Sequence, residues 1–235
     1  MRIVWATTCG ASMVRELTHL SFEDWVYFVF DHPAEGPEWH SDPEAPYWNG
    51  PAALTAEYVI RLFEDPCPAL IGFTDEELNK GLWYMISPGL GEHMLCLDEP
   101  ALPIAMRVRC VRACESLFRK LFLPRCSPHL SHCDWHGAAP LNSICYMWWD
   151  IIPVFGGPEP EDRRLLHAAA LETMAVILRL DSIACQESAL HGLGHWHSAF
   201  PEQAESMIDA FISTHADAPA ALLTYARSAR CGCVL

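Results

Sequence analysis

The sequence predicts an all-α fold of stacked antiparallel helical hairpins with little or no sheet. Apolar residues recur at helical spacing through most of the 235-residue chain, and Pro and Gly interrupt them at short intervals. No segment keeps the period-two alternation of a half-buried strand. The clearest hairpin covers 188–212, where two short helical segments meet at a tight turn and Pro201 opens the second.

The first predicted helix covers 22–30. Ser21 is a suitable N-cap for it, acidic residues fill its first turn, and Pro33 ends it. Its β-branched and aromatic residues also leave a strand open. The next segment, 32–51, is a long Pro-rich loop, and such loops are often functional. Its aromatic residues either pack onto the core or contact a partner: Trp39, Tyr47 and Trp48.

Helical patterns continue through the rest of the chain. Thr74 with Glu77 three residues later forms a capping-box pattern. Asn142 could cap the aromatic segment that follows it, which is apolar nearly all round and therefore expected to be central. Residues 126–141 are rich in Pro, His and Gly and are expected to be irregular. The predicted helices are 52–65, 67–72, 75–86, 103–123, 143–152, 160–180, one after the N-cap Ser182, one from Pro201, and 217–230.

The composition is that of a packed protein. Hydrophobic residues make up 51% of the chain, which excludes the disordered class of low hydrophobicity and high charge. No apolar run approaches the ~20 residues that cross a bilayer, so we expect no membrane contact. Eleven Cys without a regular framework favour a reducing, cytoplasmic location. We expect one all-helical domain over 13–235 after a disordered extension over 1–12, with Met13 an alternative start to Met1.

The net charge makes nucleic acid an unlikely partner. Thirty acidic and fifteen basic residues give a formal charge of -15, which repels a phosphate backbone unless the basic residues share one face. A helix over the segment 107–125 would gather Arg109, Arg112 and Arg119 on one side. That face is either simply solvated or binds an acidic partner or anion.

The C-terminal part resembles the helical repeat of HEAT-like proteins, which form α-solenoids. The likeness covers about 25 residues clearly and 160–230 loosely, and no regular repeat period is visible upstream of residue 140. The resemblance implies a helical scaffold whose concave surface binds another protein. The remainder of the chain is similar to a bacterial family from which we carry over no function. The residues that match the short Ala-Leu-x-x-Leu-Gly repeat are Ala189, Leu190, Leu193, Gly194 and Pro201.

Two His-rich clusters are candidates for a metal site. In 126–136, Cys and His recur at short intervals, and zinc favours such ligands when four of them converge. In 191–197, two His lie one helical turn apart, which lets both imidazoles reach one ion. Either cluster could instead be ordinary packing of His and Cys. If the two clusters converge in space, they form one site. The candidate ligands are His129, His132, His136, His191 and His195.

Other catalytic motifs are missing from the sequence. It contains no GxSxG elbow, no phosphate-binding GxxxxGK loop and no three-glycine dinucleotide fingerprint. We therefore expect a non-enzymatic α-helical scaffold or binding module for another protein, without a cofactor. The alternative is a metal-dependent enzyme, with zinc as the ion, whose site is formed by the 126–136 and 191–197 clusters.

Overall fold

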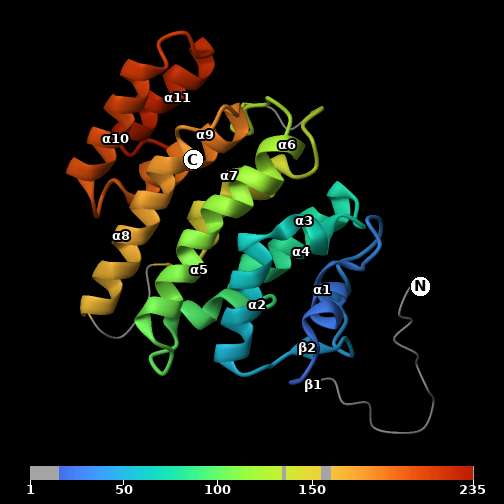
Figure 1. The fold of residues 1–235 in the computed structure, drawn as a ribbon. Helices are drawn as coiled ribbons and strands as arrows, with labels where there is room; N and C mark the ends of the chain where they lie inside the picture. The colour runs from blue at the N-terminus through green and yellow to red at the C-terminus, as the bar shows by residue number, and fades with distance from the viewer. Residues whose placement is uncertain (1–15, 134–135, 155–159, 235) are drawn as a thin grey trace, which may run out of the picture.

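The computed structural model confirms the all-α class. It describes residues 16–133, 136–154 and 160–234, so the expected extension over 1–12 lies outside the described residues. The described sheet consists of two short strands, β1 (Glu16–Leu17) and β2 (Tyr47–Trp48), which pair in parallel. Helices make up the remaining regular structure of the described chain (Figure 1).

The α-helices, in chain order, are α1 (Phe22–Phe30), α2 (Ala52–Glu64), α3 (Pro66–Leu70), α4 (Asp75–Ile86), α5 (Ile104–Leu117), α6 (Leu123–Arg125), α7 (Asn142–Ile151), α8 (Pro160–Ile177), α9 (Ile183–Trp196), α10 (Pro201–Thr214) and α11 (Ala220–Arg230). Two 3-10 helices, η1 (Trp39–Ser41) and η2 (His93–Asp98), lie in the loops after α1 and α4. A π-helical turn, η3 (Phe118–Phe122), joins α5 to α6.

The expected helix starts are confirmed where the cap is local. The Ser21 side chain accepts the backbone N–H of Asp24 at the start of α1, which settles this segment as a helix and not a strand. Thr74 and Glu77 form the full capping box of α4, with each side chain bonded to the other residue's backbone.

Two sequence-based boundaries are corrected by the structure. Asn142 is not an N-cap, because it is the first residue of α7 and its side-chain amide bonds to both backbone groups of Ser127, each at 3.0 Å. The predicted helix over 103–123 does not stop at Pro124 either. The Leu123 N–H bonds to the Phe118 carbonyl in a wider π-turn, and Pro124, which has no N–H to place, continues into α6.

Helix α9 occupies the centre of the C-terminal half. It contacts α7, α8, α10 and α11, and nearly every residue from Ala184 to Gly194 is buried. Gly192 allows this close packing, because a Cβ there would lie only 2.4 Å from the Trp149 Cβ of α7. In the N-terminal half, α1 packs on α4 and α2 on α5, and α5 in turn packs on α8 (Figure 1). This helix-on-helix packing is compatible with a helical repeat.

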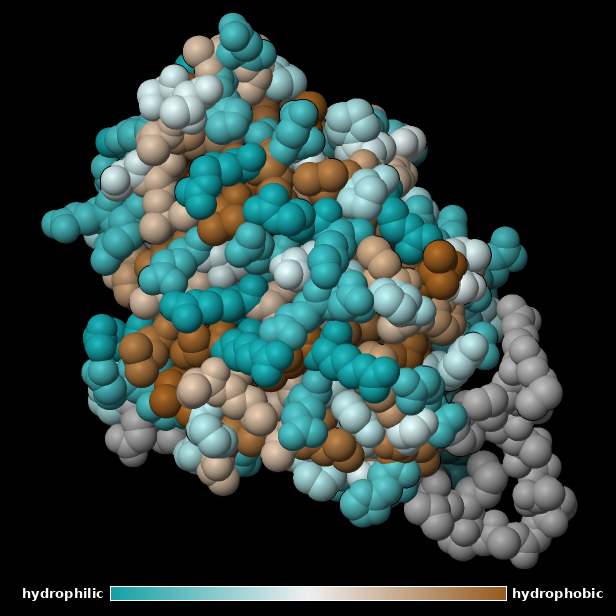
Figure 2. Space-filling model, in the orientation of Figure 1, coloured by the Kyte–Doolittle hydropathy of each residue, from teal (hydrophilic) through white to brown (hydrophobic). Residues whose placement is uncertain are grey.

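The surface mixes residue types. On the face shown in Figure 2, hydrophilic residues predominate and hydrophobic areas are interspersed among them. Within the described ranges, no helix is long and apolar enough to cross a membrane. The cysteines that the structure describes are free thiols.

Candidate functional site

Buried polar side chains converge where α9 meets α7, α11 and the loop that follows α6. Glu187 and His191 lie one turn apart on α9, and both are fully buried. Such groups are rare in a core unless they are paired or functional. The side chains that meet them come from the loop, from α7 and from α11: His132, Cys133, Tyr146, Asp150 and Tyr225.

Glu187 fixes the loop onto α9. Its carboxylate accepts the backbone N–H groups of Ser131, at 2.8 Å, and His132, at 3.1 Å. It is also 2.6 Å from Nδ1 of the His132 ring. A buried carboxylate is costly unless hydrogen bonds replace its water, and these three donors do so. The His132 ring is thereby held with Nε2 3.1 Å from the Cys133 Sγ.

Tyr225 connects His132 to the rest of the cluster. Its ring stacks on His132 with centroids 4.0 Å apart. Its hydroxyl lies 2.8 Å from Nδ1 of His191 and 3.0 Å from the Tyr146 hydroxyl. Burial raises the pKa of Tyr225 well above its usual range, and it also raises the pKa of Tyr146. Both phenols are therefore neutral and act as hydrogen-bond donors and acceptors.

His191 has one ring nitrogen in use and one without a partner. Burial, together with the nearby His195 and His132, lowers the pKa of His191 to about 3, so the ring is neutral. If Nδ1 carries the proton, it donates to the Tyr225 hydroxyl, which can then donate to Tyr146. Nε2 is left with a buried lone pair that has no hydrogen-bond partner among the described residues.

Asp150 and His195 lie close to the His191 side chain. Asp150, His191 and His195 each offer one ligand atom, and these three atoms lie within 4.8 Å of one another. His195 Nδ1 is 3.7 Å from the Asp150 carboxylate, and the two His rings are nearly perpendicular with centroids 4.5 Å apart. Because the side chains of Asp150 and His195 are each 34% exposed, solvent can reach this side of the group.

The distances fit a metal site that contracts on loading. Ligand atoms that share a zinc ion at about 2.0–2.1 Å lie roughly 3.3 Å from one another in a tetrahedral arrangement. The three atoms would therefore approach one another by at most roughly 1.5 Å. Rotation of the partly exposed Asp150 and His195 side chains can supply this movement. His191, which is locked by Tyr225, would stay in place.

The structure brings together only part of the predicted ligand set. His191 and His195 share the three-residue group, and His132 lies on the other side of Tyr225, bonded to Glu187. His129 and His136 are in the loop but do not belong to the group. The two predicted clusters thus meet through Tyr225, whose ring stacks on His132 and whose hydroxyl contacts His191.

Sequence reasoning missed two acidic residues of the cluster. Asp150 is the only charged residue in α7, and Glu187 the only one in the buried helix α9. A single acid in an otherwise apolar helix is the signal that could have found each of them, since unpaired burial of a carboxylate is costly.

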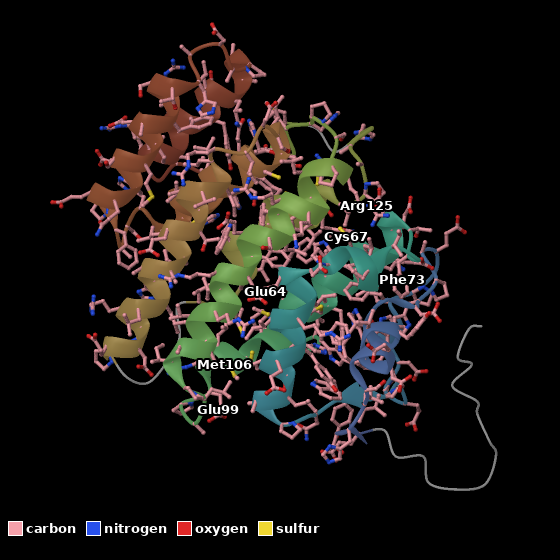
Figure 3. The ribbon with its side chains drawn as sticks, in the orientation of Figure 1. Glu64, Cys67, Phe73, Glu99, Met106 and Arg125 are labelled. Carbon is pink, nitrogen blue, oxygen red and sulfur yellow. The ribbon has the colours of Figure 1, made fainter. Side chains whose placement is uncertain are left out.

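The residues predicted to contact a partner are engaged within the chain. Arg109 makes a bidentate ion pair with Glu64 of α2, which lies beside α5 in Figure 3. Arg112 pairs with Glu172 of α8, and Arg119 with Glu115.

The two loop tryptophans pack inward. Trp48 is buried and donates to the Thr55 hydroxyl. Trp39 stacks on His32 with centroids 4.0 Å apart and also contacts Phe28. The two tryptophans therefore cover the core, as one of the two sequence interpretations expected, whereas Tyr47 of the same loop is 49% exposed.

A separate groove of about 680 Å³ lies between α1, α2 and α3 and shares no residue with the polar cluster. Apolar residues line it, including Ile71, which is 84% exposed, and Tyr27, which is 42% exposed. Four acidic residues also line it, and its one basic residue, Arg61, already pairs with one of them. These acids are Glu23, Asp31, Asp65 and Glu77.

Comparison with known proteins does not assign a function to this cluster. No protein-family model matches the chain, and neither the curated proteins nor the solved structures yield a match. The interpretation of the polar cluster therefore rests on its own geometry.

Proposed function

We propose that this protein is a metal-dependent enzyme whose ion binds Asp150, His191 and His195. The observation that carries the proposal is that His191, whose buried Nε2 has no hydrogen-bond partner among the described residues, shares a three-residue group with an imidazole and a carboxylate. Leaving such a nitrogen buried without a partner costs about 1–3 kcal/mol. Coordination to an ion would remove that cost.

The surroundings of His191 are those of a metal ligand. A ligating His commonly bonds through its other nitrogen to a fixed group, which sets the tautomer and the ring orientation. Tyr225 has this position at Nδ1, and Tyr146 supports its hydroxyl. Position is also favourable, because His191 and His195 are one turn apart on α9 and Asp150 faces them from α7.

The ligand set favours zinc or iron(II) and leaves a coordination position open. Two His and one carboxylate occur both in catalytic zinc sites and in non-haem iron sites, where the remaining positions take water or substrate. When bound, such an ion would lower the pKa of its water and supply a hydroxide nucleophile for hydrolysis. Solvent exposure of the Asp150 and His195 side chains leaves room for that water.

Zinc titration of the chelator-treated protein tests the proposal. We expect one equivalent to bind, and we expect Asp150→Asn and His195→Ala to weaken binding by more than the about 10–100-fold typical of outer-shell changes. His129→Ala is the matched control, because it lies in the neighbouring His-rich loop outside the three-residue group. Calorimetry that detects no zinc binding, or equal affinity in all four proteins, would overturn the assignment.

A scaffold role is the second candidate, and the groove between α1, α2 and α3 is the observation that favours it. Its apolar lining and acidic residues complement a basic amphipathic peptide. Fluorescence anisotropy with a labelled Leu/Lys peptide would test this role. We expect Ile71→Glu with Asp65→Lys to abolish binding, and Arg164→Ala, on the distant helix α8, to leave it unchanged. Equal binding by both variants would exclude the groove.

A further inference from the structure

We propose that Cys133 is a nucleophilic thiol, that His132 accepts its proton, and that Glu187 is the positioning residue that holds His132. The Cys133 Sγ is 3.1 Å from Nε2 of His132, and Nδ1 of the same ring is 2.6 Å from the Glu187 carboxylate. This order of thiol, imidazole and carboxylate is the arrangement that activates a nucleophile on many unrelated folds. The proposal does not depend on metal binding at Asp150.

The orientation of His132 is fixed by the fold. Glu187 is fully buried, and the backbone N–H groups of Ser131 and His132 hold its carboxylate in place. Since the carboxylate can only accept, Nδ1 of His132 must carry a proton toward it. Nε2 then presents its lone pair to Cys133. The Tyr225 ring, stacked on the imidazole, prevents it from rotating away.

The titratable groups around Cys133 and His132 differ in charge. The titratable groups that face the thiol and imidazole are Glu187 and His191 from α9, Tyr225 from α11, and Tyr146 and Asp150 from α7. Burial keeps His191, Tyr146 and Tyr225 neutral. The carboxylate of Glu187 is in direct contact with the His132 ring and is the charged group nearest to it.

Cys133 is also accessible, unlike most of the cysteines that the structure describes. It is exposed, and it lies at the surface end of the cluster. Cys114 and Cys145 are fully buried, and burial raises the pKa of both thiols, so they are poor nucleophiles. The expected substrates are molecules with an electrophilic alkyl or acyl carbon that can reach an exposed thiol.

The chemical step can be written for iodoacetamide, which we use as the probe. The Cys133 proton moves to Nε2 of His132, and the thiolate sulfur attacks the CH₂ carbon of the reagent. A carbon–sulfur bond forms, the carbon–iodine bond breaks, and iodide leaves with the bonding electrons. The imidazolium then releases its proton to solvent.

Competitive alkylation of the full chain, treated with chelator, tests the proposal. Peptide mass spectrometry after limited iodoacetamide at pH 6.5 reports the labelling rate of Cys133 against that of Cys67. Cys67 is an internal control, because it is exposed and its thiol donates a hydrogen bond to the Lys120 carbonyl. Only the thiolate reacts, so proton transfer to His132 should speed labelling, although a less basic thiolate is also a weaker nucleophile. The net expectation is that Cys133 reacts about tenfold faster than Cys67.

Two variants separate activation from simple exposure. His132→Gln should bring the Cys133/Cys67 ratio to about one, and Glu187→Gln should move the pH midpoint of Cys133 labelling upward because the imidazolium loses its countercharge. Since Glu187 is buried, circular dichroism must show that its variant is folded. If Glu187→Gln is not folded, His132→Gln is the decisive variant, because the native His132 side chain is 22% exposed. Equal rates for Cys133 and Cys67 in the wild type, or no effect of His132→Gln, would overturn the proposal.

Discussion

Two histidines of this protein are equally buried, yet only one lies in a candidate site. His93 in η2 and His191 in α9 are both fully buried, and burial lowers the pKa of each to about 3. His93 is surrounded by aromatic rings, with Trp25 and Tyr84 at centroid distances of 5.5 and 5.4 Å. His191 instead faces polar side chains, those of Tyr225, His195 and Asp150.

Burial of a histidine and convergence of ligand atoms around it have different consequences. Burial sets the charge state of both rings, because a low-dielectric environment disfavours the protonated imidazole. It gives neither ring a chemical role. The role proposed for His191 comes from ligand atoms on α7 and α9 that gather with one of its own, and from a buried nitrogen that has no partner among the described residues. Among the described residues, His93 does not belong to such a group of ligand atoms.

The largest expected effect is on metal affinity. His191→Gln should weaken zinc binding at least 100-fold, which corresponds to about 2.7 kcal/mol, because it removes the one ligand that is already locked in place. His93→Gln should leave the affinity unchanged. Calorimetric titration of both variants makes the measurement, and equal losses would remove the distinction between the two histidines.

The second effect is on stability in acid. His93 is neutral when folded and has the usual pKa of about 6.5 when unfolded, so the unfolded state binds more protons below that pH. Its stabilising contribution is complete above pH 6.5 and is lost as the pH falls toward 3. Between pH 7.5 and 4.5 the loss is about 2.7 kcal/mol, because the pH ends two units below the unfolded pKa and each of those units corresponds to about 1.36 kcal/mol.

Urea unfolding of the wild type and His93→Leu at pH 7.5 and 4.5 measures that loss. The leucine variant should lose about 2–3 kcal/mol less on acidification, while the carboxylates contribute equally to both proteins. Parallel pH dependence in the two proteins would mean that His93 titrates normally in the folded state.

A third effect concerns the packing that places α7 against α9. Gly192→Ala should destabilise the fold by about 2 kcal/mol, because the new methyl would overlap Trp149 and Met174. Gly72→Ala is the matched control, since a Cβ there meets nothing within 4 Å and the turn has no positive φ. Denaturant midpoints report both changes, and a neutral Gly192→Ala would show that α7 can shift away from α9.

The smallest effect is expected from Tyr225→Phe. Removing the hydroxyl frees Nδ1 of His191 from its partner, and a loss of about tenfold in zinc affinity should follow. Tyr84→Phe, beside His93, is the control and should not change the affinity. If the two variants bind zinc equally well, Tyr225 supports packing and not ligand orientation.

Local features of the sequence predicted the helices well. Ser21 and the Thr74–Glu77 pair act within three residues, so their pattern alone placed the starts of α1 and α4 correctly. Asn142 showed the limit of this reasoning. Its side chain had two possible partners, and the distant backbone of Ser127 prevailed over the local cap because the loop packs against α7.

The sequence by itself determined the all-α class, most helix boundaries and the two His-rich segments, because periodicity and capping depend on neighbours three or four residues apart. Only the tertiary structure decided which side chains meet. The Asp150–His191 and His132–Glu187 contacts join residues 41 and 55 positions apart, and they depend on how closely α7, α11 and the loop pack on α9. Gly192 allows that approach by having no side chain, and its role becomes visible only when Trp149 is placed against it.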